Sequence, residues 1–390
     1  MKKKPILLFV ANEVYFFISH RLPIAQEAQS RGYDVHLAAP GDHVWAPAGF
    51  STTELERLRI TFHEVPMSRR GTHPLQELKT FFTLLRIYRD LQSDIVHHLT
   101  IKPNLYGGLA ARLARLPAVV SAITGLGQMF VASGVRLRLL QPFVLRVMRL
   151  ALGHRNARVI IQNISDRDFL VKNSVVKTAN TVLIKGSGVD LSQFKPVPEP
   201  DCDPIVILPS RLIWEKGIQE FVDAARILRE TGVAARFALV GNTHSSNPRA
   251  VPEAILQAWD EEGVVEWWGR REDMPQVMAE SHIVCLPSKY GEGVPKVLLE
   301  AAAAGRPVVA TDTPGCREVI EDGVQGLLIP VADSEALATA LRRLILDQNE
   351  RVAMGAAGRN RAVRDLDIAE VVACTLSIYA ELRASSRSVR

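Results

Sequence analysis

With 390 residues, 47% of them hydrophobic and 23% charged, the chain has the length of two or three globular domains, which excludes a disordered, collagen-like or miniprotein chain. No two of its four cysteines stand at a metal-ligand spacing, so a zinc ribbon is excluded and a reducing compartment is favoured. The net charge of +5 combines +13 in residues 1–195 (26 Lys and Arg, 13 Asp and Glu) with −8 in residues 196–390 (21 and 29), so the first half should attract anionic partners.

The first apolar run, Ile6–Ala11, follows three lysines and superficially resembles a signal peptide. It is shorter than the roughly 7–15 apolar residues of a secretory core, and Asn12 and Glu13 interrupt it. We therefore predict a buried first strand. No window reaches the ~18 apolar residues of a membrane span. The chain is expected to be cytoplasmic, lying at most on the inner face of the plasma membrane as a peripheral protein.

Apolar runs of strand length alternate with helical patterns along the whole chain. In the first half, the predicted strands are Ile6–Val10, Asp34–Ala39, Ile95–His97, Ala118–Ile123 and Arg158–Gln162. In the second half, they are Ile205–Pro209, Arg236–Val240, Val264–Trp267, Ile283–Leu286, Val308–Thr311 and Gly326–Ile329. Nearly continuous apolar strands separated by helices predict parallel sheets covered by helices on both faces.

The strand pattern restarts after residues 195–204, a stretch with four prolines that is typical of an interdomain linker. We predict two doubly wound α/β domains, Rossmann-like, over residues 1–195 and 204–367. Ligands of such folds bind beyond the carboxyl ends of the strands, so two facing domains would form a cleft.

The segment from Arg136 to Arg158 combines arginines with long apolar side chains, and residues 95–165 contain no acidic residue. A basic amphipathic helix of this kind can lie on an anionic membrane surface. Its candidate membrane contacts are Arg136, Arg138, Phe143, Arg146 and Arg149. The alternative is a packed helix with a solvated basic face. Nucleic acid is not an expected partner, because no recognition helix, zinc motif or aromatic RNA-binding strand is present.

The most informative stretch runs from Leu286 to Gly305, where a predicted strand, a glycine-rich loop and a helix follow one another. Exposed amides at such a loop can bind a phosphate. Glu292 lies in the loop and Glu300 in the second turn of the helix. A carboxylate there can accept hydrogen bonds from vicinal hydroxyls, such as those of a ribose.

A second stretch, residues 210–217, follows the first strand of the second half. Arg211 and Lys216 lie across a predicted strand-to-helix turn. Two cations at that place can hold a diphosphate and stabilise the charge that develops when it leaves. The alternative is a pair of ordinary surface cations.

The sequence resembles the retaining GT-B glycosyltransferases of family 4 at three places: Arg211, Lys216-Gly217 and the Glu292–Glu300 pair. Residues 185–196 are similar to the run that joins the two domains of that family. Residues 100–111 and 123–127 resemble the branch that acts on sugars linked to polyprenyl diphosphate, such as undecaprenyl diphosphate, in polysaccharide and glycan assembly.

The resemblance implies a role for each matching position. Arg211 and Lys216 would hold the donor diphosphate with the amides of Gly293 and Val294. Glu292 would contact the donor sugar, so that Glu292, Arg211 and Lys216 form the catalytic set. Glu300 would bind the nucleoside ribose, and the base would lie near Arg270. The family needs no metal or other cofactor, and the cations supply the charge instead.

Two first-half positions depart from the family pattern. Ala11-Asn12-Glu13 replaces a Gly-Gly loop, and Leu99 stands where many members have a histidine. The polar candidates for contact with the acceptor or the donor sugar are therefore Asn12, His20, Arg21, His98, Lys102, Asn104 and Gly125. For His98 the alternative is a hydrogen-bonded structural histidine, and for Lys102 an ordinary exposed lysine.

The predicted function is retaining transfer of a sugar, expected to be an N-acetylhexosamine, from a UDP-sugar to a saccharide linked to polyprenyl diphosphate. By the resemblance, the C-terminal helix over residues 368–390 would cross back onto the first domain. The alternatives are a non-hydrolysing UDP-sugar 2-epimerase, which would turn over UDP-sugar alone, and a non-catalytic protein that binds nucleotide sugars.

Overall fold

The computed structural model describes residues 4–41, 53–68, 73–126, 135–243 and 247–387, and within these ranges the side chains of residues 135–140 and 387 are not described. The chain divides into two compact units. Unit 1 contains the described residues up to Leu126, those from 135 to Ser187, and those from Val371 onward; unit 2 contains Gly188–Glu370.

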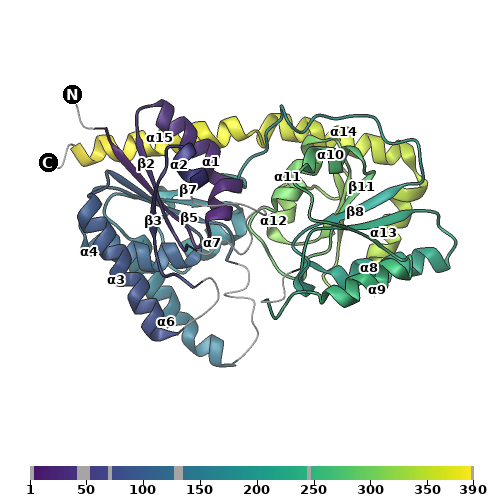
Figure 1. Cartoon of the computed structure of the whole chain (residues 1–390), viewed down its shortest axis with the longest axis horizontal. Helices are drawn as coiled ribbons and strands as arrows, with labels where there is room; N and C mark the ends of the chain where they lie inside the picture. Colours follow the sequence, from purple (N-terminus) through teal and green to yellow (C-terminus); the bar gives the residue numbers. More distant parts are fainter. Residues whose placement is uncertain (1–3, 42–52, 69–72, 127–134, 244–246, 388–390) are drawn as a thin grey trace. The chain divides into compact units, whose positions relative to one another are not determined.

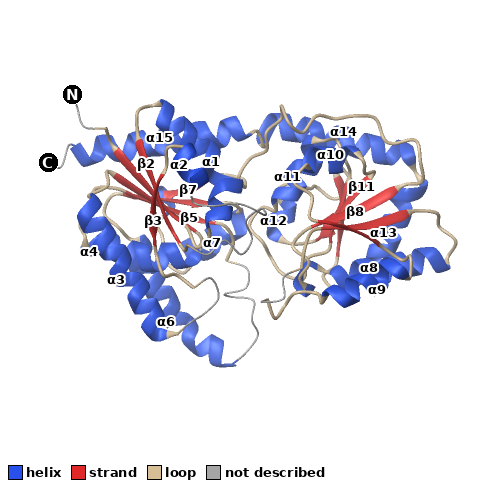
Figure 2. Cartoon of the chain, viewed as in Figure 1, coloured by secondary structure: helices blue, strands red, loops and turns tan. Residues whose placement is uncertain are grey.

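Unit 1 is built around a parallel sheet in the order β3-β2-β1-β4-β5-β6-β7. The strands are β1 (Ile6–Val10), β2 (Asp34–Ala39), β3 (Thr61–Glu64), β4 (Ile95–Leu99), β5 (Val119–Ile123), β6 (Ala157–Ile161) and β7 (Thr181–Leu183). Its helices are α1 (Val14–Ser30), α2 (Thr53–Arg57), α3 (Pro74–Leu91), the π-helical turn η1 (Pro103–Gly107), α4 (Gly108–Leu113), α6 (Val135–Leu152), α7 (Ile164–Lys172) and the short turn η2 (Thr178–Asn180). Figure 2 shows helices on both faces of this sheet.

Unit 2 has a parallel sheet in the order β10-β9-β8-β11-β12-β13. The strands are β8 (Ile205–Pro209), β9 (Arg236–Val240), β10 (Glu266–Gly269), β11 (Ile283–Leu286), β12 (Val308–Thr311) and β13 (Gly326–Ile329). The helices are η3 (Trp214–Lys216), α8 (Ile218–Glu230), α9 (Glu253–Glu261), α10 (Met274–Ala279), α11 (Lys296–Ala303), α12 (Pro314–Arg317), α13 (Ser334–Leu346) and α14 (Gln348–Asp365), followed by α15 (Ile368–Arg387).

Both sheets are buried on two faces, which explains their unbroken apolar strands. In β1, Leu7 and Phe9 pack into one core while Leu8 and Val10 pack into another. In β8, Val206 and Leu208 face one core and Ile207 faces the other. The prediction of two doubly wound α/β units is confirmed. The predicted strands differ from the observed ones by at most two residues at an end.

Two strands of unit 1, β3 and β7, were not predicted. Both lie at the edges of the sheet, and none of their residues is fully buried. Edge strands need no continuous apolar run, because solvent covers part of them. Their sequences, Thr-Phe-His-Glu and Thr-Val-Leu, are therefore too short and too mixed in polarity to be distinguished from loops.

The proline-rich segment is packed against unit 2, whereas the sequence predicted a linker. Phe194 lies in the unit 2 core, and Arg359 Nη1 donates to its carbonyl at 2.9 Å. Glu199 forms a buried ion pair with Arg351 at 2.9 Å. The division into units accordingly falls at Ser187, before the predicted boundary at residue 195.

The last helix, α15, contributes to the core of unit 1 from Val371 onward. The hydroxyl of Tyr379 and Nδ1 of His97 in β4 are hydrogen-bonded at 2.6 Å. Asn156 Nδ2 donates to the Leu382 carbonyl at 2.9 Å. In Figure 1 the yellow helix lies along unit 1 beside α1.

Candidate functional site

The predicted diphosphate site lies where the strand order of unit 2 reverses. β8 is central, with β9 on one side and β11 on the other. Ligands of doubly wound sheets bind beyond the carboxyl ends of the strands at such a point, where the loops after β8 and β11 begin. The first loop carries Arg211 and Lys216, and the second carries Glu292.

Backbone contacts hold the two loops together. The Lys289 amide donates to the Glu215 carbonyl at 2.8 Å. Thr311 Oγ1, at the end of β12, donates to the Ser288 carbonyl at 2.8 Å and so fixes the second loop to the neighbouring strand. Gly217 has φ +74°, and a Cβ built there would lie 2.0 Å from the Pro287 carbonyl oxygen. Only glycine permits both this conformation and this approach. Lys216 is thus fixed against the loop that carries the glutamate.

Lys216 and Glu292 form an ion pair. Lys216 Nζ lies 2.6 Å from Glu292 Oε1, and Ser288 Oγ donates to the same oxygen at 2.9 Å. The lysine side chain is 9% exposed and the glutamate side chain 21%. Lys216 Nζ also lies 5.7 Å from the centroid of the Tyr290 ring. The pair is therefore mostly shielded from water. Electrostatic interactions in such a shielded place are stronger than at an open surface.

Opposing effects set the pKa of Glu292. Burial acts to raise it, but the Lys216 charge and the hydrogen bonds from Lys216 and Ser288 lower it below its ordinary value. Arg211 adds to the lowering through its charge, and the same charge acts on the hydroxyl of Tyr290. Both predicted cations therefore act on the same carboxylate, as an anion-binding pair requires.

The backbone after Glu292 is positioned by a close contact with α12. A Cβ on Gly315 would lie 1.5 Å from the Gly293 carbonyl oxygen, so the two backbones touch. Val294 is buried, and α11 begins two residues later at Lys296. The Gly293–Val294 peptide is accordingly held beside the glutamate at the start of a helix, where amides favour anions.

Glu300 lies in the second turn of α11, as predicted, and is buried. Lys296 Nζ approaches its Oε1 at 3.4 Å. Burial raises the pKa of Glu300, and the lysine only partly offsets this effect. The helix ends at Gly305, whose φ is +71° and whose amide donates to Ala302, as in a Schellman motif.

Arg270 follows β10, the edge strand two positions from β8. It is half-buried and forms an ion pair with Glu272 at 3.4 Å. The assigned contact with the nucleotide base therefore stays a prediction.

Comparisons with known families decide the class of the protein. The model of the glycosyl transferases group 1 matches residues 203–347, and that of the glycosyl transferase 4-like family matches residues 6–163. The chain is a group 1 glycosyltransferase. The epimerase alternative finds no support in these matches.

Two relatives of this glycosyltransferase are similar over most of their length. The Campylobacter jejuni N,N'-diacetylbacillosaminyl-diphospho-undecaprenol α-1,3-N-acetylgalactosaminyltransferase is 28% identical over 87% of the chain and 88% of its own length. The Escherichia coli UDP-Gal:α-D-GlcNAc-diphosphoundecaprenol α-1,3-galactosyltransferase is 24% identical over 82% and 83%. HepE of Anabaena, crystallised with UDP and glucose, superposes with a TM-score of 0.74 at 21% identity, covering 96% of this chain and all of HepE. The glycosyltransferase thus has the GT-B fold.

In unit 1 of the glycosyltransferase, the candidates at the carboxyl ends of the strands are Asn12 and Gly125. Asn12 follows β1 and is half-buried. Gly125 follows β5 with φ +123°, a conformation that favours glycine. His20 lies on α1, where its ring stacks on Phe16 with the centroids 4.4 Å apart.

Other candidates of the glycosyltransferase lie inside unit 1. His98 is completely buried, its Nε2 is 2.8 Å from the Tyr88 hydroxyl, and burial lowers its pKa to about 3. Arg21 is 3% exposed, and burial lowers its pKa to about 10. The structural alternative given for His98 therefore fits its position, because its ring lies between β4 and α3 rather than at the strand end.

The segment after β4 contains Lys102 and Asn104. Lys102 Nζ donates to the Ser68 carbonyl at 2.8 Å and contacts Glu77 Oε1 at 2.5 Å. Asn104 is buried and donates to the Ala122 carbonyl at 2.8 Å. In the structure described, both side chains stabilise the turn of η1, and contact with an acceptor stays a prediction.

One residue of this segment escaped sequence analysis. Thr100 directly follows β4 and has φ +72°, a strained value for a β-branched residue, and its buried Oγ1 has no hydrogen-bond partner. It lies at the switch point of unit 1, where β1 and β4 are neighbours. Residue type alone gives no indication of a backbone angle, so the sequence could not have identified it.

The proposed membrane helix corresponds to α6. Among its described side chains, Arg146 and Arg149 are exposed and Phe143 is 67% exposed. Met148 is buried and attaches the helix to unit 1. The side chains of Arg136 and Arg138 lie outside the described residues. Within the described part of the chain, no helix is both long and apolar enough to cross a membrane.

Proposed function

We propose that this glycosyltransferase transfers a sugar from a UDP-sugar to a saccharide linked to polyprenyl diphosphate. The names of the two relatives support the acceptor class, because both act on sugars joined to diphospho-undecaprenol. One of them transfers N-acetylgalactosamine and the other galactose. An N-acetylhexosamine is accordingly the donor sugar that we propose.

The observation that carries the proposal is the buried Lys216–Glu292 pair with Arg211 acting on the same carboxylate. Arg211, Lys216 and the Gly293–Val294 amides would bind the diphosphate of UDP. Glu292 would accept hydrogen bonds from the sugar hydroxyls, and Glu300 from the ribose hydroxyls. Arg270 would lie near the uracil.

In the reaction, the bond between the anomeric carbon and the β-phosphate oxygen breaks, and UDP leaves with the electron pair. An acceptor hydroxyl oxygen bonds to the anomeric carbon, and its proton passes to a β-phosphate oxygen of the departing UDP. The charge that develops on UDP would be stabilised by Lys216 and Arg211 in a shielded site. We propose that these cations do this without a metal, and that the anomeric configuration is retained.

We further propose that the protein is a cytoplasmic, peripheral protein of the inner membrane face. The basic, partly apolar surface of α6, with Phe143, Arg146 and Arg149 exposed, has the composition of an interfacial helix. Such contact would bring unit 1 to the layer in which a polyprenyl diphosphate is anchored.

A panel of UDP- and GDP-sugars, each incubated with a polyprenyl-diphosphate-linked sugar and analysed by mass spectrometry, tests this function. The expected product is the acceptor enlarged by one sugar from a UDP donor only. The same incubations without acceptor should leave the UDP-sugar intact. Transfer from GDP-sugars alone, or epimerisation of the donor without acceptor, would contradict the proposal.

A further inference from the structure

A cavity of about 550 Å³ lies in unit 1, away from the strand ends that carry the proposed site. Its wall includes His154 and Arg155, which precede β6, and Lys177 to Asn180, which precede β7. The cavity is therefore at the amino-terminal edge of the sheet, opposite the edge at which Asn12 and Gly125 lie. Its volume is within the range of small-molecule sites.

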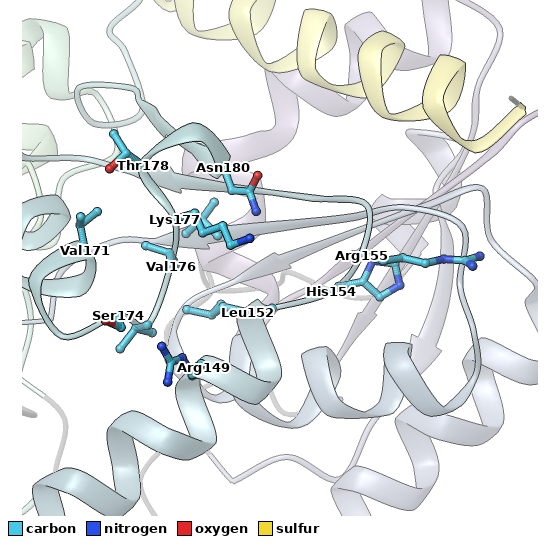
Figure 3. A pocket seen from close by; sticks show the side chains of 13 residues that line it. Arg149, Leu152, His154, Arg155, Val171, Ser174, Val176, Lys177, Thr178 and Asn180 are labelled. Carbon is cyan, nitrogen blue, oxygen red and sulfur yellow. The ribbon is translucent and has the colours of Figure 1, made fainter. Parts of the chain in front are cut away.

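The lining combines apolar and polar side chains. The apolar side chains are Leu152, Val159, Val171, Val175 and Val176, and the polar ones include Ser174, Thr178 and Asn180. In Figure 3, Leu152 and Val176 lie between Arg149, at the end of α6, and Lys177, while Arg155 projects away from the other labelled side chains. Arg149 and Lys177 thus come from two different elements.

The residues that line this cavity carry positive charge only. Arg149, Arg155 and Lys177 are cationic, and no Asp or Glu is among the lining residues. Burial lowers the pKa of His154 below its ordinary value of 6.5, so the imidazole is neutral at pH 7. A ligand that matches this wall is anionic.

The carboxyl end of α6, which would ordinarily repel an anion, is neutralised. Arg112 Nη1 donates to the Leu150 carbonyl at 2.9 Å and to the Gly153 carbonyl at 2.8 Å. Gly153 itself lines the cavity. The helix end is therefore less unfavourable to an anion than an uncompensated carboxyl end would be.

A second cavity, of about 510 Å³, continues along α6 and shares Arg149 with the first. Its lining includes Pro142, Leu145 and Leu150. Leu150 is 51% exposed, and the neighbouring Phe143 is 67% exposed. The cationic cavity thus adjoins an exposed apolar surface. A soluble phosphate has no apolar part that could contact this surface, whereas a phospholipid carries a phosphate and acyl chains together.

We propose that the first cavity binds the phosphate headgroup of an anionic phospholipid between Arg149 and Lys177, with the acyl part lying along α6. This inference rests on the proposed contact of α6 with a membrane. The proposed cavity would bind one lipid at a defined site, in addition to the general attraction between the basic surface of α6 and an anionic membrane.

Binding of dihexanoyl-phosphatidylglycerol, kept below the concentration at which it forms micelles, tests the site by calorimetry on the full chain. We expect one molecule per chain for the wild type, and a loss of affinity of about tenfold or more in R149Q/K177Q, because two charged phosphate contacts are removed. The matched control is K79Q/R89Q, which removes the same charge from exposed positions of α3 and should bind as the wild type does. Thermal melting checks that each variant is folded.

Dihexanoyl-phosphatidylcholine and glycerol 3-phosphate complete the experiment, and both should bind more weakly. Equal losses in the two double variants, equal binding of the zwitterionic lipid, or equally tight binding of glycerol 3-phosphate would each overturn the proposal. Sedimentation with phosphatidylglycerol vesicles separates the two hypotheses. Vesicle binding without one-to-one lipid binding refutes only the cavity site, whereas failure to sediment refutes the membrane contact of α6.

Discussion

Replacing Lys216 by methionine tests whether its charge stabilises the departing nucleotide. Departure adds about one negative charge to the diphosphate. Because the lysine side chain is 9% exposed, an effective dielectric of about 20 applies, and a unit charge at about 4 Å interacts by about 4 kcal/mol. The negative charge of Glu292 cancels part of this attraction. We therefore expect a loss of about 3 kcal/mol of transition-state stabilisation, which is a rate reduction of about 10²–10³.

The assay is kcat/KM for product formation from UDP-sugar, measured beside a matched control, Lys289→Met. Lys289 lies in the neighbouring loop, the one that carries Glu292, and pairs with Glu220 at the same 2.6 Å distance, but it is assigned no contact with the donor. The control should stay within a few-fold of wild type. A loss of tenfold or less in Lys216→Met, or an equal loss in both variants, would refute the assignment.

The same variant has a predictable effect on stability. Loss of Lys216 leaves Glu292 without its cation, which costs about 1–3 kcal/mol for a buried unsatisfied group. Adding Glu292→Gln removes the second charge and should restore much of the stability without restoring turnover. A double variant that regains activity would show that the pair is structural.

The pH dependence of the wild type and of Lys216→Met should have opposite signs. In the wild type the pKa of Glu292 is lowered, so its contribution to stability is present above its unfolded pKa of about 4.3 and is lost as the pH falls through the folded value. In Lys216→Met, burial without the cation raises that pKa, so acid should stabilise. Chemical denaturation between pH 4 and 7 should therefore show the difference between the two proteins shrinking toward pH 4. A constant difference would argue against the coupling.

Three further substitutions examine the geometry around the two sites. Burial raises the pKa of Glu300, so its negative charge costs stability as the pH rises through the folded pKa. Glu300→Gln should therefore raise Tm at pH 7, and it should raise KM for UDP-sugar. An unchanged KM would remove Glu300 from the donor site. Gly315→Ala places a Cβ 1.5 Å from the Gly293 carbonyl oxygen. We expect this overpacking to lower the free energy of unfolding by about 1–3 kcal/mol and to weaken UDP binding, measured by calorimetry, at least tenfold. Unaltered binding would contradict a role for the Gly293–Val294 peptide. Thr100→Gly relieves a backbone at φ +72° and should stabilise the protein by about 1 kcal/mol in denaturant while lowering kcat/KM; destabilisation with full activity would make Thr100 purely structural.

The fold was predictable because its information is local. An unbroken apolar strand such as Ile205–Pro209 can be recognised from its own residues alone, and each of the buried central strands was predicted in this way. The edge strand Thr61–Glu64 was not predicted. It forms by pairing with His36 to Ala39, and its own residues do not specify this neighbour. Residues 195–204 were interpreted as a linker from their prolines, which indicate the lack of regular structure but not the lack of packing, and Glu199 of this segment forms a buried ion pair with Arg351.

The candidate residues of the two units differ in the same way. Lys216 and Glu292 lie in short motifs in which glycines and the ends of β8 and β11 fix the local geometry, and the family resemblance assigned both of them to the donor. In unit 1, the register of β4 decides which side chain reaches the strand end. That register directs His98 into the core against Tyr88 and leaves Thr100 at the switch point. A shift of one residue reverses the face, and composition cannot detect it.

The ion pair of Lys216 with Glu292 also explains how a cation can remain in a shielded loop before the donor arrives. An unpaired buried ammonium would lose its proton or its position, whereas here Glu292 Oε1 compensates it at 2.6 Å. When a diphosphate binds, Lys216 has to serve two anions, and Arg211 supplies the second positive charge that makes this favourable. The carboxylate is then a partner whose remaining oxygen can accept from sugar hydroxyls. If this exchange is correct, Arg211→Met should weaken UDP binding more than it weakens the folded state, because Lys216 contributes more than Arg211 to compensating Glu292. Calorimetry and chemical denaturation of the same variant measure the two effects.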